Sequence, residues 1–358
     1  MKRFMTFGLA LMMTLSLAAC GDNGNTSSAG GSADNNAAAD AAATEFTEVV
    51  SEEGTEAGDV EAETEKPESI TVTCLDGNGE EVEVTVPYDP QRVAVIDFAS
   101  LDILDNLGLG DRVVGSVNIT LDYIASYNEN ENVANLGTLK EPDMEAVMAC
   151  EPDVIFMAGR ASDYYDALAE IAPVVRLTTD SKLGLVESVR KNSKTIASIF
   201  GLEDEVDEKL AAYDERIAAL AEFAEGKTVL VGMFSGGSMS LLGNDGRCSI
   251  IGTEIGFENV GVSEDTATAT HGNEVSYEFV VDANPDYIFV MNRDAAIGAD
   301  GADLAQDVIE NELVMQTDTY KNGHIIYLEN PGIWYTAEGG ITALDIMLSD
   351  LETALLTE

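Results

Sequence analysis

The chain has 358 residues, with 66 acidic and 18 basic side chains and a formal net charge of −48 at pH 7. This length accommodates two domains of ordinary size. Because contacts to nucleic-acid phosphates require a basic surface, the charge excludes non-specific nucleic-acid binding as a main role, and we expect no nucleic-acid partner.

The first 20 residues have the pattern of a secretion signal. Lys2 and Arg3 precede a mostly apolar run from Phe4 to Leu17, which is short for a membrane span. The run leads into Leu-Ala-Ala-Cys ending at Cys20, which resembles the lipobox of bacterial lipoproteins. An ordinary signal peptide with an incidental cysteine is the alternative. We expect residues 1–20 to be a lipoprotein signal peptide, with Cys20 lipidated and the protein held on the extracytoplasmic face of the cell membrane.

The next segment, residues 21–66, is rich in Gly, Ala, Ser, Asn, Asp and Glu, and Lys66 is its only base. It contains too few apolar residues to offset the entropy lost on folding. We therefore expect a disordered acidic tether, which extends because its charges repel one another.

Strand and helix patterns alternate from residue 67 to residue 200, and we expect these residues to form an N-terminal α/β lobe. Two alternating runs flank Asp-Gly-Asn-Gly at residues 76–79, which predicts a hairpin. The other predicted elements are strands at Arg92–Ile96, Val113–Val117 and Val174–Leu177, and a helix at Leu101–Leu107 that ends at Gly108.

One unit of this lobe occurs again far along the chain. Residues 145–160 read E-A-V-M-A-C-E-P-D-V-I-F-M-A-G-R, and residues 278–293 read E-F-V-V-D-A-N-P-D-Y-I-F-V-M-N-R. In each copy we expect a short helix from the Glu, an extended residue before the Pro, and then a strand buried on both faces. Arg160 and Arg293 follow these strands, at the sheet edge where open α/β folds bind ligands.

Helical spacing continues through Val186–Phe200 and Glu205–Ala224, so we expect residues 201–226 to be a connecting helix. Residues 227–358 are expected to form a C-terminal α/β lobe, although the short connections also allow a single domain. Its predicted elements are strands at Lys227–Phe234 and His324–Leu328, helices at Ser249–Ile255, Leu304–Gln316 and Ile341–Leu356, and a loop at Trp334-Tyr335.

Three cysteines remain after Cys20, namely Cys74, Cys150 and Cys248. The odd number leaves at least one thiol unpaired, while Cys74 and Cys150 fall in one lobe and allow a disulfide. Their spacing fits no metal motif, so buried free thiols are the default expectation.

The order of several motifs resembles the catecholate-siderophore (petrobactin- or enterobactin-type) binding lipoproteins of ABC importers, over residues 68–357. These motifs are residues 92–115, Thr-His-Gly at 270–272, residues 293–298 and Trp334-Tyr335. The resemblance implies two Rossmann-like lobes joined by a rigid long helix, the class III substrate-binding fold. It further implies a monomer without catalysis or an intrinsic cofactor, which delivers a ferric siderophore to a permease dimer and its ATPase.

The resemblance also assigns site residues. It implies that Arg160, Arg247, Arg293, Trp334 and Tyr335 contact the ligand. Guanidinium groups suit the deprotonated oxygens of a ferric catecholate, and each charged hydrogen bond contributes about 1.5–3 kcal/mol. The alternative for each arginine is an ion pair at a strand end.

Iron ligands and docking residues are implied in the same way. A tetradentate bis-catecholate leaves two positions of octahedral Fe(III) open, which His271 and Tyr335 are expected to fill. Glu145 and Glu278 are expected to dock the two lobes on the permease, although a Glu at a helix N-terminus is also favoured by the helix dipole. A binder of corrinoid or haem is the alternative function. A surface hydrolase or oxidoreductase is disfavoured because no nucleophile elbow or nucleotide loop is evident.

Overall fold

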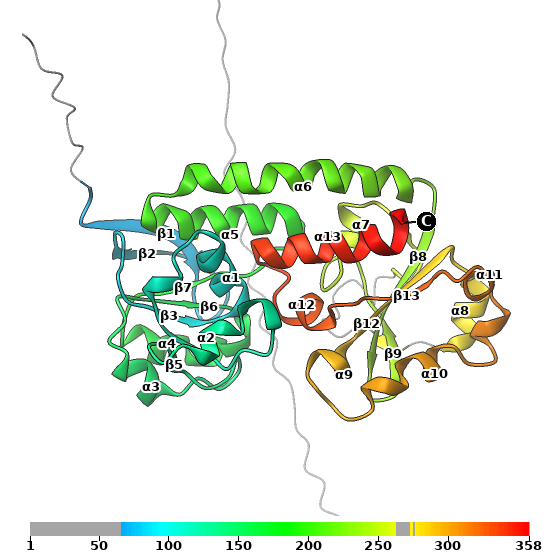
Figure 1. The fold of residues 1–358 in the computed structure, drawn as a ribbon, viewed down its shortest axis with the longest axis horizontal. Coiled ribbons are helices and arrows are strands. Elements are labelled where there is room, and N and C mark those ends of the chain that lie inside the picture. The colour runs from blue at the N-terminus through cyan, green and yellow to red at the C-terminus, as the bar shows by residue number, and fades with distance from the viewer. Residues whose placement is uncertain (1–65, 263–272, 275, 358) are drawn as a thin grey trace, which may run out of the picture. The chain divides into compact units, whose positions relative to one another are not determined.

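The computed structural model describes residues 66–262, 273–274 and 276–357. Its strands form two sheets (Figure 1). The first sheet contains β1 (Ser69–Leu75), β2 (Glu81–Pro87), β3 (Val93–Ile96), β4 (Val113–Ser116), β5 (Ala134–Asn135), β6 (Val154–Met157) and β7 (Val174–Arg176). The second contains β8 (Thr228–Ser235), β9 (Ser238–Leu241), β10 (Glu258–Asn259), β11 (Asn273–Glu274), β12 (Tyr287–Asn292) and β13 (Ile325–Tyr327).

Both sheets are parallel at their centres. The strand order is β2-β1-β7-β6-β3-β4-β5 in the first sheet and β11-β9-β8-β12-β13 in the second, with β10 beside β8. Strand β6 pairs in parallel with β3 and β7, and β12 pairs in parallel with β8 and β13. All residues of β6 are buried, which agrees with a strand covered on both faces.

The helices connect these strands. They are α1 (Phe98–Asn106), α2 (Ser126–Glu129), α3 (Met144–Ala149), α4 (Tyr165–Ala169), α5 (Leu185–Phe200), α6 (Glu203–Ala224), α7 (Ile250–Thr253), α8 (Tyr277–Ala283), α9 (Arg293–Ala296), α10 (Ala305–Ile309), α11 (Asp318–Lys321), α12 (Pro331–Thr336) and α13 (Ile341–Leu356). Short 3-10 turns lie at Gly110–Arg112 (η1), Asp122–Ile124 (η2), Gly159–Tyr164 (η3), Ala302–Leu304 (η4) and Val314–Gln316 (η5). The expected α/β fold is confirmed.

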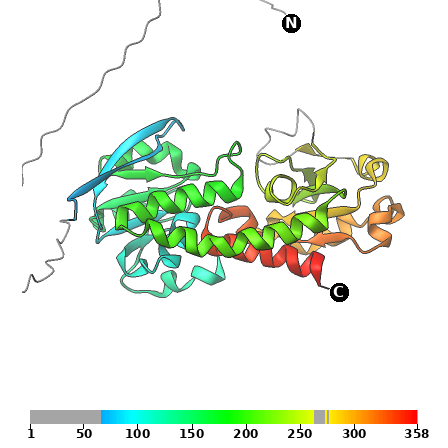
Figure 2. The same ribbon diagram turned by 90° about the horizontal axis from the view of Figure 1, so that it is seen from above.

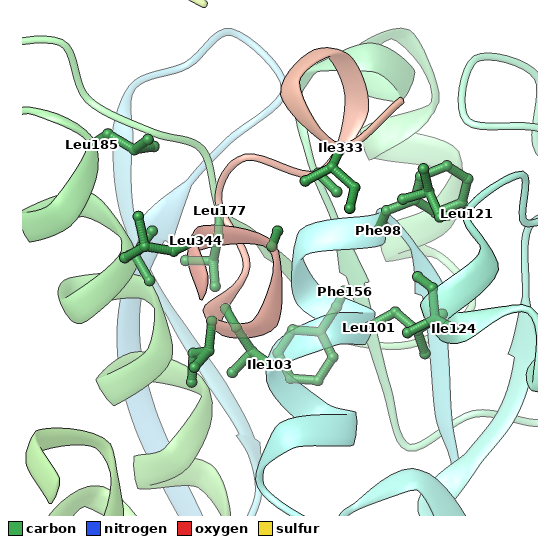
Figure 3. Packing of buried hydrophobic residues seen from close by; sticks show 14 of the residues in the cluster. Phe98, Leu101, Ile103, Leu121, Ile124, Phe156, Leu177, Leu185, Ile333 and Leu344 are labelled. Carbon is green, nitrogen blue, oxygen red and sulfur yellow. The ribbon is translucent and has the colours of Figure 1, made fainter. Parts of the chain in front are cut away.

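The long helix α6 runs from the end of α5 to the start of β8 and packs against both α5 and α13 (Figures 1 and 2). Helix α13 also packs on α1, so the C-terminal segment returns to a helix of the N-terminal part of the chain. Figure 3 shows Ile333 of α12 near Phe98 and Leu121, and Leu344 of α13 near Leu177. One apolar core therefore continues through the helical layer.

A buried carboxylate fixes the beginning of α13. Asp102 of α1 accepts hydrogen bonds from Thr342 N at 2.9 Å, from Ala343 N at 2.8 Å and from the Tyr123 hydroxyl at 2.9 Å. Burial raises the pKa of this carboxyl to about 6, although these donors oppose the rise. The side chain satisfies two backbone N–H groups at the helix N-terminus, which have no partner within the helix.

The repeated unit forms the expected helix and strand in both copies, as α3 with β6 and α8 with β12. The expected extended residue before each Pro is wrong. Glu151 has φ 44° and Asn284 has φ 38°, so both lie in the left-handed region. Each closes the end of its helix, because Glu151 N donates to Met148 O and Asn284 N to Val280 O.

Two further expectations differ from the structure. The helix expected at Leu304–Gln316 is broken into η4, α10 and η5. The side chain of Asn311 donates to Val308 O at the end of α10 and accepts from Leu313 N and Val314 N at the start of η5, so it separates these two elements. The loop expected at Trp334-Tyr335 is helical, because Pro331 occupies the first turn of α12 and presets its φ.

The three described cysteines, Cys74, Cys150 and Cys248, are buried free thiols, so the disulfide alternative is not realised. No helix among the described residues is long and apolar enough to cross a membrane.

Candidate functional site

The loops that follow β6 and β12 carry two of the expected arginines. Arg160 lies in η3, three residues after the end of β6, and Arg293 is the first residue of α9, directly after β12. Arg247 lies in the segment between β9 and α7. All three guanidinium groups converge on one side chain, Tyr335 of α12.

The Tyr335 ring is surrounded by these cations. The guanidinium carbon lies 4.4 Å from the ring centroid for Arg247, 5.1 Å for Arg160 and 5.5 Å for Arg293. Arg160 Nη2 and Arg247 Nε donate to the Tyr335 carbonyl at 2.6 and 3.3 Å, and Arg293 Nε donates to the phenolic oxygen at 3.0 Å. We call these four residues the arginine–tyrosine cluster.

The charges of the cluster lower the pKa of the Tyr335 phenol. Burial of Tyr335, of which 5% is exposed, is the largest single influence and raises its pKa. The hydrogen bond from Arg293 and the charges of all three arginines together outweigh it, so the pKa is lowered from its usual value. The pKa of Arg160 is lowered as well, first by burial and then by the charge of Arg247.

Two acids beside the cluster, Asp97 and Glu338, have a raised pKa. Asp97 follows β3 and caps α1, accepting from Ser100 N at 2.8 Å, and burial raises the pKa of its carboxyl. Burial likewise raises the pKa of Glu338 to about 7, against the charge of Arg247 and a hydrogen bond from Cys248 N at 3.4 Å. Burial thus makes ionisation of both acids less favourable than in water, beside the positive charges of the three arginines.

Hollows lie on two sides of the cluster. One of about 340 Å³ is lined by Asp97, Arg247 and Glu338, and another of about 290 Å³ is lined by Phe98, Lys140 and Arg293. Arg160, Tyr335 and Thr336 line both. These volumes are of the size of small-molecule sites.

Residues at the ends of strands of the second sheet hold Arg293 in place. Arg293 Nη1 donates to Ser235 Oγ at 3.1 Å and lies 3.7 Å from Asp294 Oδ1. Asp294 in turn accepts from Gly236 N at 2.7 Å, in the turn between β8 and β9. Gly236 and Gly237 have φ 60° and 81°, a two-residue hairpin geometry that glycine favours. The turn at Gly236 and Gly237 therefore positions Asp294, the carboxylate beside Arg293.

The structure places Trp334 differently from the expectation. Its exposed fraction is 0%, and Nε1 donates to Asp350 Oδ2 of α13 at 2.8 Å. The side chain lines neither hollow of the cluster. The expected ligand contact of Trp334 is corrected: the indole is a core group that fixes α12 on α13.

The remaining candidates lie away from the cluster or outside the described residues. Glu145 and Glu278 are both exposed and both occupy the second position of a short helix, after the caps Asp143 and Ser276. His271 and Cys20 lie outside the described residues. Among the residues that the structure describes, no group of three or more His, Cys, Asp or Glu side chains is arranged to hold a metal ion.

Sequence reasoning missed Asp97 and Glu338. The rule that pointed to Arg160 and Arg293, a polar residue just after a buried strand, applies equally to Asp97 after β3. Nothing local indicated Glu338, which reaches the cluster only because α12 returns between the two sheets.

Residues 93–331 match the family model described as periplasmic binding protein. The petrobactin-binding protein YclQ of Bacillus subtilis is 37% identical over 293 residues, which cover 81% of this chain and 89% of YclQ. The ferric-anguibactin-binding protein FatB of Vibrio anguillarum is 28% identical over 270 residues, which cover 73% of this chain and 81% of FatB.

Solved structures of binding proteins also align with this chain. The crystal structure of YclQ aligns with a TM-score of 0.73 and 34% identity, covering 81% of this chain and 100% of that chain. The periplasmic catecholate-siderophore binding protein VctP of Vibrio cholerae aligns with a TM-score of 0.71 and 30% identity, covering 79% of this chain and 100% of that chain.

Proposed function

The chain belongs to the periplasmic binding protein family, and from this premise we propose that it captures a ferric catecholate siderophore and delivers it to an ABC import permease. The observation that carries the proposal is the convergence of Arg160, Arg247 and Arg293 on Tyr335. The names of YclQ and VctP, which refer to petrobactin and to catecholate siderophores, support it.

The chemistry of the cluster suits this ligand. Catecholate oxygens bound to Fe(III) remain negatively charged, and guanidinium groups donate to such oxygens without losing their own charge. The faces of catechol rings also accept cations, as the Tyr335 ring does here. A ligand that is both aromatic and anionic therefore matches the arginines better than a purely aliphatic anion.

We extend the proposal to the iron atom. The pKa of Tyr335 is lowered, so its phenol ionises more easily than that of an ordinary tyrosine, and phenolate oxygen is a good ligand for Fe(III). For this the phenol must exchange its bond with Arg293 Nε for the metal. His271 is the second proposed ligand for a tetradentate siderophore.

The remaining parts of the proposal concern delivery. We propose a monomer without catalysis or an intrinsic cofactor, held on the outer face of the cell membrane by lipid on Cys20 and the tether 21–66. The lobes 67–200 and 227–358, joined by residues 201–226, would dock on the permease dimer through Glu145 and Glu278. Both glutamates are exposed at equivalent positions of the repeat, which suits two-point docking.

A titration tests the proposal. The full-length chain is titrated with ferric complexes of a bis-catecholate, a trihydroxamate and citrate, and binding is followed by the visible charge-transfer band or by calorimetry. We expect the catecholate complex to bind at least about tenfold more tightly, a difference of about 1.4 kcal/mol. Equal or tighter binding of the hydroxamate or citrate complex would contradict the proposal, as would a haem Soret band without catecholate binding.

A further inference from the structure

A third hollow, of about 490 Å³, lies beside the arginine–tyrosine cluster but is lined by other cations. Its walls are the hairpin β1–β2, the segment after β7 and helix α5. It shares Leu177, Thr178, Thr179 and Asn192 with the hollow of about 340 Å³. The two spaces are therefore neighbours across one wall.

Arg176, the last residue of β7, lines this third hollow, and only 9% of it is exposed. Its Nη1 donates to the carbonyl of Asp76 in the hairpin turn. Its Nε is buried and has no hydrogen-bond partner among the described residues, and no described carboxylate forms an ion pair with the side chain. A buried guanidinium with one carbonyl partner lacks the counter-charge that such groups normally have.

The rest of the lining does not supply that charge. Asp180 accepts from Lys182 N at 2.9 Å, and Glu81 lies 3.9 Å from Lys191 in an exposed pair. Glu80 is exposed at the rim. Since exposed pairs and rim charges are screened by water, the buried cation of Arg176 is the least compensated charge in the hollow.

Hydroxyl groups complete the lining. Thr73 of β1, Thr178 and Thr179 after β7, and Ser188 and Thr195 of α5 line this space. The hydroxyls of Ser188 and Thr195 already donate to backbone carbonyls, at 2.6 and 3.0 Å, and are left to act as acceptors. A guanidinium offers a planar fork that matches a carboxylate, and hydroxyls both donate to and accept from alcohol groups. The lining therefore combines the donors that a hydroxycarboxylate requires.

We propose that the third hollow is an additional anion site, in which Arg176 binds a carboxylate and the surrounding Ser and Thr hydroxyls contact a hydroxycarboxylate. The carboxylate comes either from a separate small anion or from a part of the ligand whose iron-bound head occupies the cluster. The second source rests on the proposed function. One ligand can reach both places because Arg176 lies close to the cluster. Its Nη2 is 3.5 Å from the position that a Cβ at Gly159, the neighbour of Arg160, would occupy.

The first arm of the test uses iron-free citrate, titrated by calorimetry into the full-length chain. We expect citrate to bind the wild type and to bind Arg176→Gln at least about tenfold more weakly, about 1.4 kcal/mol. Arg112→Gln makes the same change of charge at an arginine that pairs with Asp89 outside the hollow, and we expect it to bind like the wild type. Arg176→Lys, which keeps the charge but loses the fork, should be intermediate and serves if Arg176→Gln does not fold.

The second arm compares ferric complexes of 3,4-dihydroxybenzoate and of 3,4-dihydroxybenzamide, which differ in a carboxylate. If the carboxylate belongs to the iron ligand, the benzoate complex should bind the wild type more tightly, and Arg176→Gln should remove that advantage without weakening the benzamide complex. The proposal is overturned if citrate does not bind the wild type and the carboxylate gives no advantage that depends on Arg176. If neither ferric complex binds, the proposed function fails, while the citrate arm still decides the additional site.

Discussion

Glu338 should make ligand binding depend on pH. Its carboxyl lines the hollow of about 340 Å³ together with Arg247, and burial raises its pKa to about 7. At neutral pH roughly half of the molecules therefore carry an ionised Glu338, roughly one tenth at about pH 6 and nine tenths at about pH 8. An anionic ligand in this hollow meets a second negative charge at the higher pH.

The size of the effect follows from the scale of the hollow. Two negative charges separated by roughly 8 Å, at an effective dielectric constant of about 20, repel each other by about 2 kcal/mol. This energy corresponds to roughly thirtyfold in the dissociation constant. Ionisation of Glu338 would also compete with the ligand for Arg247. Glu338→Gln removes the charge and keeps a side chain of the same size.

The assay measures the dissociation constant of a ferric bis-catecholate for the wild type and Glu338→Gln at about pH 6 and about pH 8. At each pH, the dissociation constant of the wild type is divided by that of Glu338→Gln. The titration of the ligand itself does not affect this ratio, because both proteins meet the same form of the ligand. We expect a ratio near one at the lower pH, and tighter binding by the variant, by about tenfold or more, at the higher pH. A ratio of one at both values would refute the reasoning.

The same group links stability to pH. The folded-state pKa of Glu338 is raised from 4.5 to about 7, so the folded protein binds the proton more tightly than the unfolded chain. Its contribution is fully present below about pH 4.5 and is lost as the pH rises through about 7, by up to roughly 3 kcal/mol. Relative to Glu338→Gln, the wild type should lose unfolding free energy over this range, as measured by urea denaturation.

Three other perturbations separate structural from functional roles. Trp334→Phe should lower the unfolding free energy by about 1–3 kcal/mol, because a buried hydrogen bond is lost, and leave the ligand affinity unchanged. Gly340→Ala should cost about 1–3 kcal/mol in urea denaturation, because its Cβ would overlap the carboxylate that caps α13, whereas Gly246→Ala, with open space around its Cβ, should be nearly neutral. Glu145→Ala with Glu278→Ala should abolish uptake of the ferric ligand by cells and leave binding to the purified protein intact; normal uptake would exclude docking through these glutamates.

Local patterns predicted most of the fold. Apolar runs bounded by Pro or Gly correctly predicted β3, β6, β8 and β12, and helical spacing that ends at Gly201 correctly predicted α5. These patterns are local because burial and chain stiffness act over a few residues. The loop expected at Trp334-Tyr335 and the single helix expected at residues 304–316 were wrong, because one residue decides the local geometry in each place. Pro331 starts a helix there, and the amide of Asn311 ends one.

The site was predictable only in part. Arg160 and Arg293 follow from the repeat and from the chemistry of strand ends. The burial of Trp334 did not follow, because it depends on Asp350, 16 residues later, and on the return of α13 to α6 and α1. The uncompensated Arg176 was equally hidden, since a sequence does not report which charges lack a partner.

The most direct test of the central claim is the affinity of a ferric bis-catecholate for three variants, Arg160→Gln, Arg247→Gln and Arg293→Gln, each compared with Arg112→Gln. Each cluster variant loses one charged donor, so we predict at least about tenfold weaker binding for each, and wild-type affinity for the control. Wild-type affinity in all three cluster variants would contradict the account, because the ligand would then not be held by the arginines that surround Tyr335.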